Sequence, residues 1–142
     1  MRIVIDTNVV ASGIFFGGRP RELLEKLLLH EFDAYISKEI LEEYQETIDY
    51  LRDQYPTQKV SVPLMQITAA CKMIATSTKI EVCRDPDDDK FIECAVDSKS
   101  LYIVSGDKDL LSIGDYENVE IITVSEFFGR LNKKRSKNGK NS

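Results

Sequence analysis

The sequence predicts an α/β protein with three layers, α/β/α, in which helices cover both faces of a central, mostly parallel sheet. Short apolar, β-branched runs alternate with stretches whose apolar residues recur at helical spacing, and this alternation is typical of strand–helix–strand units. With 142 residues, 42% of them hydrophobic, the chain can bury one substantial core. We therefore expect a single folded domain over residues 1–132.

Four strands are expected from apolar runs that stop at polar or turn residues. The first run places Ile3, Val4 and Ile5 in a buried strand that ends at a carboxylate, Asp6. A charge in that place requires a partner or a role. A β-branched stretch, residues 78–83, predicts a short extended segment. The four predicted strands are residues 1–6, 32–37, 101–107 and 119–124.

Helices are expected between and after these strands. The clearest follows Ser37, a favourable N-cap residue, and keeps one apolar face until Pro56 ends it. The chain also turns from strand into helix near Asn8. The other predicted helices are residues 20–32, residues 62–76, a helix starting near Lys90 behind a cluster of acids, and residues 125–133.

Charge is distributed unevenly along the chain. The net charge is −5, yet six of the 19 basic residues fall within residues 130–140, where there is no acidic residue. Residues 1–129 therefore carry 13 basic against 24 acidic side chains. Such an acidic body disfavours a polyanionic partner unless bound cations neutralise it locally. Residues 133–142 are predicted to form a basic, disordered tail.

The composition disfavours histidine and cysteine chemistry. His30 is the single histidine, and the three cysteines lack the spacing of a disulfide framework or a zinc site. They fit a reducing, cytoplasmic environment as small core residues. No apolar run approaches the roughly 18 residues that cross a membrane, and the first residues do not resemble a signal peptide. We therefore expect a cytoplasmic protein without a membrane partner.

Acidic side chains from four segments are predicted to meet at one edge of the sheet. Parallel sheets bind ligands beyond the carboxyl ends of their strands, and Asp6 and Asp107 each follow such a strand. Residues 85–89 open a helix, and Glu43 lies near the apolar face of the helix after the second strand. Crowded carboxylates repel one another unless cations lie between them. Because Mg²⁺ and Mn²⁺ prefer oxygen ligands, the pattern indicates a divalent metal site.

Four stretches of the chain together resemble the PIN domain, a family of metal-dependent ribonucleases found in toxins and RNA-processing proteins. The stretches are VIDTNVVASG, ISKEILEEY, DPDDDKFIECA and YIVSGDKDLL. They follow the order of the family and cover nearly the whole chain before the tail, and the pattern is closest to the stand-alone, toxin-like branch. The resemblance implies a PIN-like, Rossmann-like fold and cleavage of single-stranded or loop RNA with Mg²⁺ or Mn²⁺.

The resemblance also implies which residues form the site. The acidic quartet, as catalytic residues and metal ligands, falls on Asp6, Glu43, Asp89 and Asp107. The supporting residues are Asn8, Ser105, Asp109, Asp85 and Asp88. The register of the third acid stays open, because Asp85 or Asp88 can replace or assist Asp89. The ordinary alternative for these acids is a helix cap or a solvated surface charge.

Rival classes of protein fit the sequence less well. A haloacid-dehalogenase-type phosphatase requires a second aspartate two residues after the first, where this chain has Asn8. A response-regulator receiver requires an acidic pair before its acceptor aspartate and a late lysine, and the strand LYIVSGD offers neither. The alternative within the family is a non-catalytic PIN scaffold that binds RNA or a partner protein. The resemblance further suggests an antitoxin partner and a homodimer.

Overall fold

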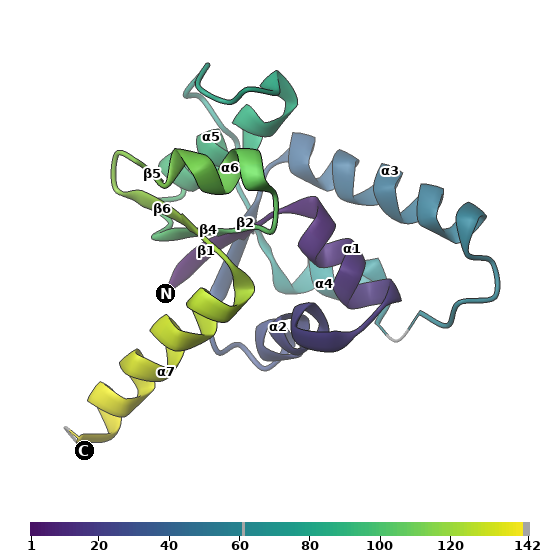
Figure 1. Cartoon of the computed structure of the whole chain (residues 1–142), viewed down its shortest axis with the longest axis horizontal. Helices are drawn as coiled ribbons and strands as arrows, with labels where there is room; N and C mark the ends of the chain where they lie inside the picture. The colour runs from purple at the N-terminus through teal and green to yellow at the C-terminus, as the bar shows by residue number, and fades with distance from the viewer. Residues whose placement is uncertain (61, 141–142) are drawn as a thin grey trace.

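The sheet has six strands in the order β3-β2-β1-β4-β6-β5 (Figure 1). The computed structural model describes residues 1–60 and 62–140. Within them every strand pair is parallel except β5 with β6, so the predicted, mostly parallel sheet is confirmed. The strands are β1 (Arg2–Ile5), β2 (Asp33–Ile36), β3 (Lys72–Met73), β4 (Tyr102–Val104), β5 (Asp115–Tyr116) and β6 (Val119–Ile122).

Both faces of the sheet are covered at its centre. Successive strand residues point to opposite faces, yet Ile3 and Val4 are 0% exposed and Ile5 is 2% exposed. A strand can bury consecutive apolar residues in this way only when helices pack on each side of it. The three-layer α/β/α fold is therefore confirmed.

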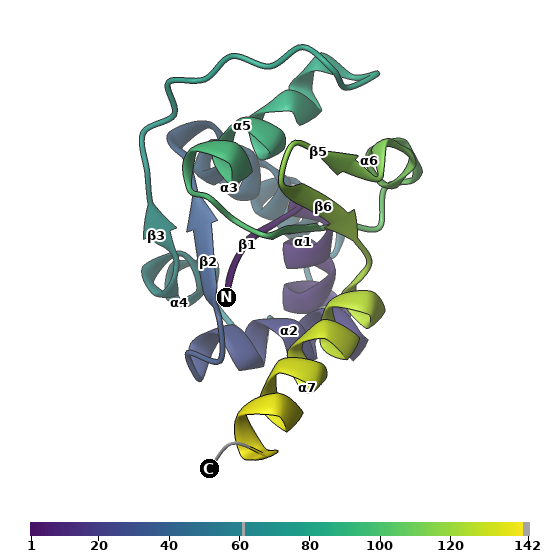
Figure 2. The ribbon, with the colours of Figure 1, turned by 90° about the vertical axis from the view of Figure 1, so that its left-hand side faces the viewer.

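The helices fill the connections between strands. Helix α5 packs across β1 and β4, and α1 packs against α2 and α3. Figures 1 and 2 show α7 extending away from the sheet beside α2. Within the described residues, no helix is both long and apolar enough to cross a membrane. The helices are α1 (Thr7–Phe15), α2 (Gly18–Leu28), α3 (Lys38–Gln54), α4 (Leu64–Ala70), the 3₁₀ turn η1 (Pro86–Asp88), α5 (Asp89–Asp97), α6 (Lys108–Ile113) and α7 (Val124–Lys140).

The predicted helix over residues 62–76 is wrong in its second half. Helix α4 ends at Ala70, and Lys72 and Met73 instead form β3, which pairs in parallel with β2. The carbonyl of Ile36 also accepts the N–H of Ile74 at 2.9 Å. The edge of β2 offers unpaired backbone groups to this stretch, and sequence periodicity carries no information about such an edge.

Two short elements were not expected. The chain after Asp107 forms α6, and Asp115 and Tyr116 form β5, which lies antiparallel to β6. Both elements are too short for their periodicity to be recognised. The extended segment predicted at residues 78–83 forms no strand, because its backbone bonds to side chains of α5 rather than to the sheet.

Residues 133–140, which the sequence predicted as part of a disordered tail, lie in helix α7. Helix α7 continues through the basic residues to Lys140. Lysine and arginine favour helix and complement the negative end of the helix dipole. The guanidinium of Arg135 also lies 2.6 Å from a carboxylate oxygen of Glu31. Residues 141–142 lie outside the described residues.

Truncation after Leu131 should leave the domain folded. Residues 132–136 are exposed, and Arg135 within them pairs with Glu31 of the domain. Because exposed ion pairs contribute little, the free energy of unfolding should fall by less than about 1 kcal/mol. Urea unfolding followed by circular dichroism measures the change. A loss of several kcal/mol would show that the last turns of α7 pack against the domain.

Candidate active site

Asp6 is buried at the carboxyl end of β1. Its backbone N–H bonds to the carbonyl of Val104 at 3.0 Å, which ties it to β4, and the residue is 5% exposed. Asp6 occupies the N-cap position of α1, but its side chain makes no capping hydrogen bond. Instead, Oδ2 accepts the hydroxyl proton of Ser105 at 2.7 Å. The ordinary explanation of Asp6 as a side-chain cap is therefore wrong.

Asp107 stands beyond the end of β4, beside Ser105. Ser105 is fully buried, and its Oγ accepts the backbone N–H of Asp107 at 3.0 Å. Asp107 caps α6 through Oδ1, which accepts the N–H groups of Asp109 and Leu110 at 2.7 and 3.4 Å. One hydroxyl, that of Ser105, thus connects the acids that follow two neighbouring strands. Asp109 lies further out, with one carboxylate oxygen 3.9 Å from the exposed Arg84.

Glu43 enters the site from α3. Its Oε2 accepts the hydroxyl proton of Thr7, and its Oε1 lies 2.7 Å from the ammonium of Lys90. The next residue, Tyr44, is 1% exposed and donates its hydroxyl proton to the carbonyl of Ile5. This bond anchors α3 at the end of β1, and burial raises the pKa of Tyr44 well above its usual value.

Lys90 and Thr7 were not identified from the sequence as site residues. A signal for each was present, because Lys90 directly follows the acidic run and Thr7 lies between Asp6 and Asn8. Both contacts to Glu43 join segments far apart in the chain. Their contacts with Glu43 could therefore be identified only from the three-dimensional structure.

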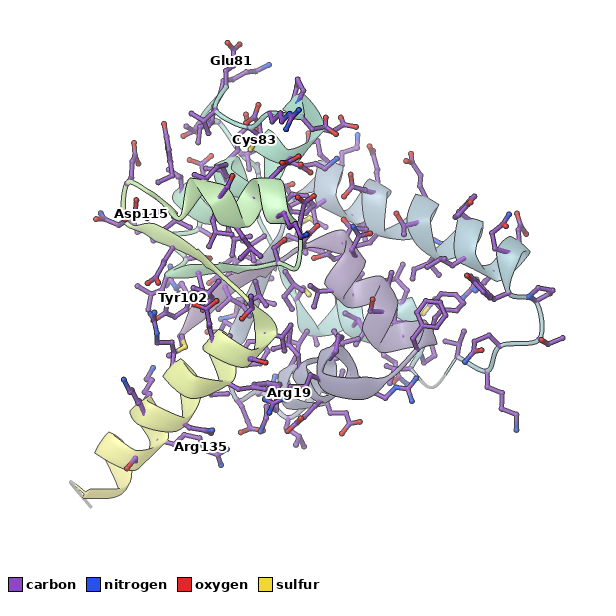
Figure 3. All side chains as sticks on the ribbon, in the orientation of Figure 1. Arg19, Glu81, Cys83, Tyr102, Asp115 and Arg135 are labelled. Carbon is purple, nitrogen blue, oxygen red and sulfur yellow. The ribbon has the colours of Figure 1, made fainter. Side chains whose placement is uncertain are left out.

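Asp88 and Asp89 are adjacent in sequence but differ in their contacts. Oδ1 of Asp89 accepts the backbone N–H groups of Val82 and Cys83 at 3.2 and 2.9 Å. Figure 3 shows Cys83 on the loop that precedes η1 and α5. The carboxylate of Asp88 instead experiences the negative charges of the acids of three other elements, Asp6, Asp107 and Glu43. The charge of Asp88 is thus felt together with those of the acidic cluster, whereas Oδ1 of Asp89 holds the loop. Asp89 also lines the cavity that contains Glu43.

Two further acids of α5, Glu93 and Asp97, also accept backbone N–H groups of the loop that precedes η1. Oε2 of Glu93 accepts the N–H of Ile80 at 2.9 Å, and Oδ2 of Asp97 accepts the N–H groups of Ser77 and Thr78 at 2.8 and 3.1 Å. The three acids are four residues apart, so they share one face of the helix. This acidic face of α5 replaces a neighbouring strand as the hydrogen-bond partner of residues 77–83.

The pKa shifts of Asp6 and Asp88 reflect the crowding of the acids. Burial raises the pKa of Asp6, the hydrogen bond from Ser105 opposes that rise, and the charges of Glu43 and Asp107 add to it. Burial, followed by the charges of its acidic neighbours, raises the pKa of Asp88 to about 6. Each of these carboxylates is thus less stable as an anion than it would be in water.

The remaining predicted residues lie around this cluster. Oδ1 of Asp85 accepts the N–H of Asp87 at 3.0 Å and begins the η1 turn. Its charge also contributes to the raised pKa of Asp88. Asn8 lines a cavity of about 410 Å³ together with Ser105 and Asp107. These supporting residues therefore border the cluster from two sides.

The donor chemistry of the cluster fits a hard divalent cation. Carboxylate oxygens come from α3, the α5 N-terminus and the ends of β1 and β4, and Mg²⁺ and Mn²⁺ prefer such ligands. Within residues 1–60 and 62–140, no three acidic, histidine or cysteine side chains are arranged to hold a metal ion. Carboxylate oxygens of Asp6 and Glu43 instead bond to Ser105, Thr7 and Lys90.

Comparison with known proteins identifies the family. Residues 2–109 match the family model described as the PIN domain, so the chain belongs to the PIN domain family. The match extends from β1 to the start of α6 and includes all the acids described above. Because PIN domains are generally nucleases, the family indicates a nuclease function.

A similar protein is found in an archaeon. The chain is 34% identical over 122 residues to the uncharacterized protein MJ1680 of Methanocaldococcus jannaschii, a match that covers 81% of this chain and 76% of the relative. No solved structure matches the chain. The relative carries no assigned activity in its name, so the chemistry must be argued from the site.

Asp88→Asn and Asp89→Asn form a matched pair that separates the two roles. Asp88→Asn removes one charge from the cluster, so metal-free stability should stay equal or rise by up to about 1 kcal/mol, after allowance for solvent screening. Asp89→Asn weakens the bonds to Val82 and Cys83 and should cost about 1 kcal/mol. Urea unfolding in the presence of a chelator measures both. Equal losses in the two variants would contradict this division.

The pH dependence of metal-free stability should differ in the same pair. The folded-state pKa of Asp88 is about 6, whereas an aspartate in the unfolded chain has a pKa of about 3.9. As the pH rises through this window, the unfolded state loses its proton first, so the free energy of unfolding should fall. The fall should be smaller in Asp88→Asn than in Asp89→Asn. Identical pH profiles would argue against a crowded Asp88.

Proposed function

We propose that the protein is a metal-dependent endoribonuclease that cleaves single-stranded or loop RNA. The observation that carries the proposal is the convergence of carboxylates from four segments, with raised pKa values at Asp6 and Asp88. A protein that buries like charges together loses stability unless a cation compensates them. Membership in a family of nucleases supplies the reaction class that such a cation serves.

The proposed ligands of Mg²⁺ or Mn²⁺ are four acids. They are Asp6, Glu43, Asp88 and Asp107, with Asp88 in the place that the sequence assigned to Asp89. The contact of Asp89 with the backbone of Val82 and Cys83 supports this exchange. Ser105 and Thr7 act as positioning residues, because their hydroxyls hold the carboxylates of Asp6 and Glu43.

The bound metal supplies Lewis acidity, which lowers the pKa of a water molecule and stabilises charge on the phosphate. No protein nucleophile is needed. Burial raises the pKa of each of Cys71, Cys83 and Cys94 to about 12, so these thiols stay protonated at neutral pH. His30 lies between α2 and β2, at the amino end of that strand and therefore away from the acidic cluster at the carboxyl ends of the strands.

The substrate is RNA with unpaired bases, because paired RNA hides its base edges in a deep groove.

The PIN resemblance also supports a cellular role as the toxin of a toxin–antitoxin pair, acting in the cytoplasm as a homodimer. Sedimentation of the purified protein tests the dimer. Co-expression with a neighbouring small gene tests the pairing, and growth arrest that such a gene fails to relieve would argue against an antitoxin.

Asp6→Asn should separate metal chemistry from folding. Asparagine keeps the shape of the side chain but removes one charge, so metal-free stability should stay equal or rise by up to about 1 kcal/mol. Millimolar Mn²⁺ should raise the melting temperature of the natural protein clearly and that of the variant less, because binding to the native state alone stabilises it. Cleavage of unstructured RNA should fall by about two orders of magnitude or more. Differential scanning fluorimetry and a gel assay measure these effects.

Asp115→Asn is the matched control for that experiment. Asp115 is exposed on β5 (Figure 3), and the same chemical change there should alter neither metal binding nor cleavage. Full cleavage by a folded Asp6→Asn protein would refute the nuclease proposal. Retained RNA binding without any cleavage in the natural protein would favour the non-catalytic PIN scaffold.

A further inference from the structure

Two cavities of similar size adjoin the acidic cluster, and their charges differ sharply. The acidic cavity, about 430 Å³ between α3 and α5, is lined by eight carboxylates and two lysines. The second cavity, about 410 Å³, lies beyond the carboxyl ends of β4 and β6, and Asp107 is the one charged residue among the described residues that line it. Because RNA is a polyanion, the acidic cavity repels it. The second cavity offers the less repulsive approach to the same acids.

The second cavity combines apolar surface with hydroxyl groups, and we call it the hydroxyl-lined cavity. Val9, Pro20 and Val124 contribute apolar surface. The hydroxyl groups come from α1, from the end of β4 and from the beginning of α7. These residues are Ser12, Ser105, Thr123 and Ser125. Apolar walls with a few polar groups are the usual lining of a site for a small organic ligand, and the volume lies in the usual range.

We infer that the hydroxyl-lined cavity binds the nucleoside next to the scissile phosphate of RNA, an inference that rests on the proposed nuclease function. A nucleoside has a flat, apolar base and a hydroxylated sugar, which match the two kinds of lining. Ser105 and Asp107 belong both to this cavity and to the acidic cluster. A nucleoside bound there therefore places its adjoining phosphate beside the carboxylates.

Positively charged side chains lie on the surface near the hydroxyl-lined cavity. Arg19 precedes Pro20 of the cavity wall, and its exposed guanidinium lies 5.4 Å from the ring centre of Phe128 on α7. Figure 3 shows Arg19 on α2 and Arg135 further along α7. Helices α2 and α7 contact one another. A strand that leaves the cavity along these helices meets positive side chains, which can bind its phosphates.

Mononucleotide binding tests the location without any need for cleavage. Titration of ¹⁵N-labelled protein with 5′-AMP or 5′-UMP in Mg²⁺ should shift the backbone amide signals of Ser12, Gly106 and Ser125. The signals of Ile80 and Glu93, in the acidic cavity, should stay in place. Shifts confined to the acidic cavity, or no shift at saturating nucleotide, would overturn the inference.

Ser125→Glu tests the cavity during turnover. Ser125 is exposed in the first turn of α7, where a glutamate favours the helix, so the variant should fold. Its charge should raise the KM for an unstructured oligoribonucleotide about three- to tenfold, the scale of a unit repulsion in a partly hydrated site, with kcat changed less than about twofold. Gln66→Glu adds the same charge on α4, which lines neither cavity, and should change neither constant.

The two proposals fail in different ways. Mononucleotide shifts at Ser125 in a protein that cleaves no RNA would refute the nuclease and leave the nucleoside site standing. Cleavage with an unchanged KM in Ser125→Glu, together with absent shifts, would refute the nucleoside site and leave the nuclease standing. Should Ser125→Glu unfold, Arg19→Gln on the exposed rim provides the second variant, and it should reduce the salt dependence of RNA binding.

Discussion

The crowding of carboxylates at the carboxyl ends of β1 and β4 is the constraint on which the rest of the site depends. The parallel pairing of these strands places Asp6 and Asp107 beside one another, and α3 and the η1 turn add Glu43 and Asp88. Each anion raises the free energy of its neighbours. The native state tolerates the cluster because it is small and because the core beneath it, built on the fully covered β1, stabilises the whole sheet.

Hydrogen-bond donors placed by different elements partly offset this repulsion. Ser105 donates to Asp6 across β1 and β4, and Thr7 and Lys90 hold Glu43 from α1 and α5. A cation held by these carboxylates would compensate part of the same repulsion. Metal binding and the organisation of the site are therefore expected to be coupled.

The acidic face of α5 shows that a carboxylate can serve the fold instead of the chemistry. Asp89, Glu93 and Asp97 accept backbone N–H groups along residues 77–83. A hydrogen bond from Thr78 lowers the pKa of Asp97, which keeps that carboxylate charged. No strand within residues 1–60 and 62–140 pairs with this segment, so its N–H groups would otherwise depend on water. An acidic cluster in a sequence can thus contain two populations with opposite roles.

The alternation of strands and helices and the acids at the strand ends were determined by the sequence alone. Periodicity reports which face of an element is buried, and the carboxyl ends of parallel strands meet by geometry. The different contacts of Asp88 and Asp89, from which the exchange of these two ligands is proposed, were decided by tertiary structure, because adjacent residues at a helix start project about 100° apart. The pairing of Lys72 and Met73 with β2 and the continuation of α7 likewise depend on neighbours distant in the chain. A local sequence pattern cannot predict such contacts, because they form and stabilise the structure only after segments distant in the chain have come together.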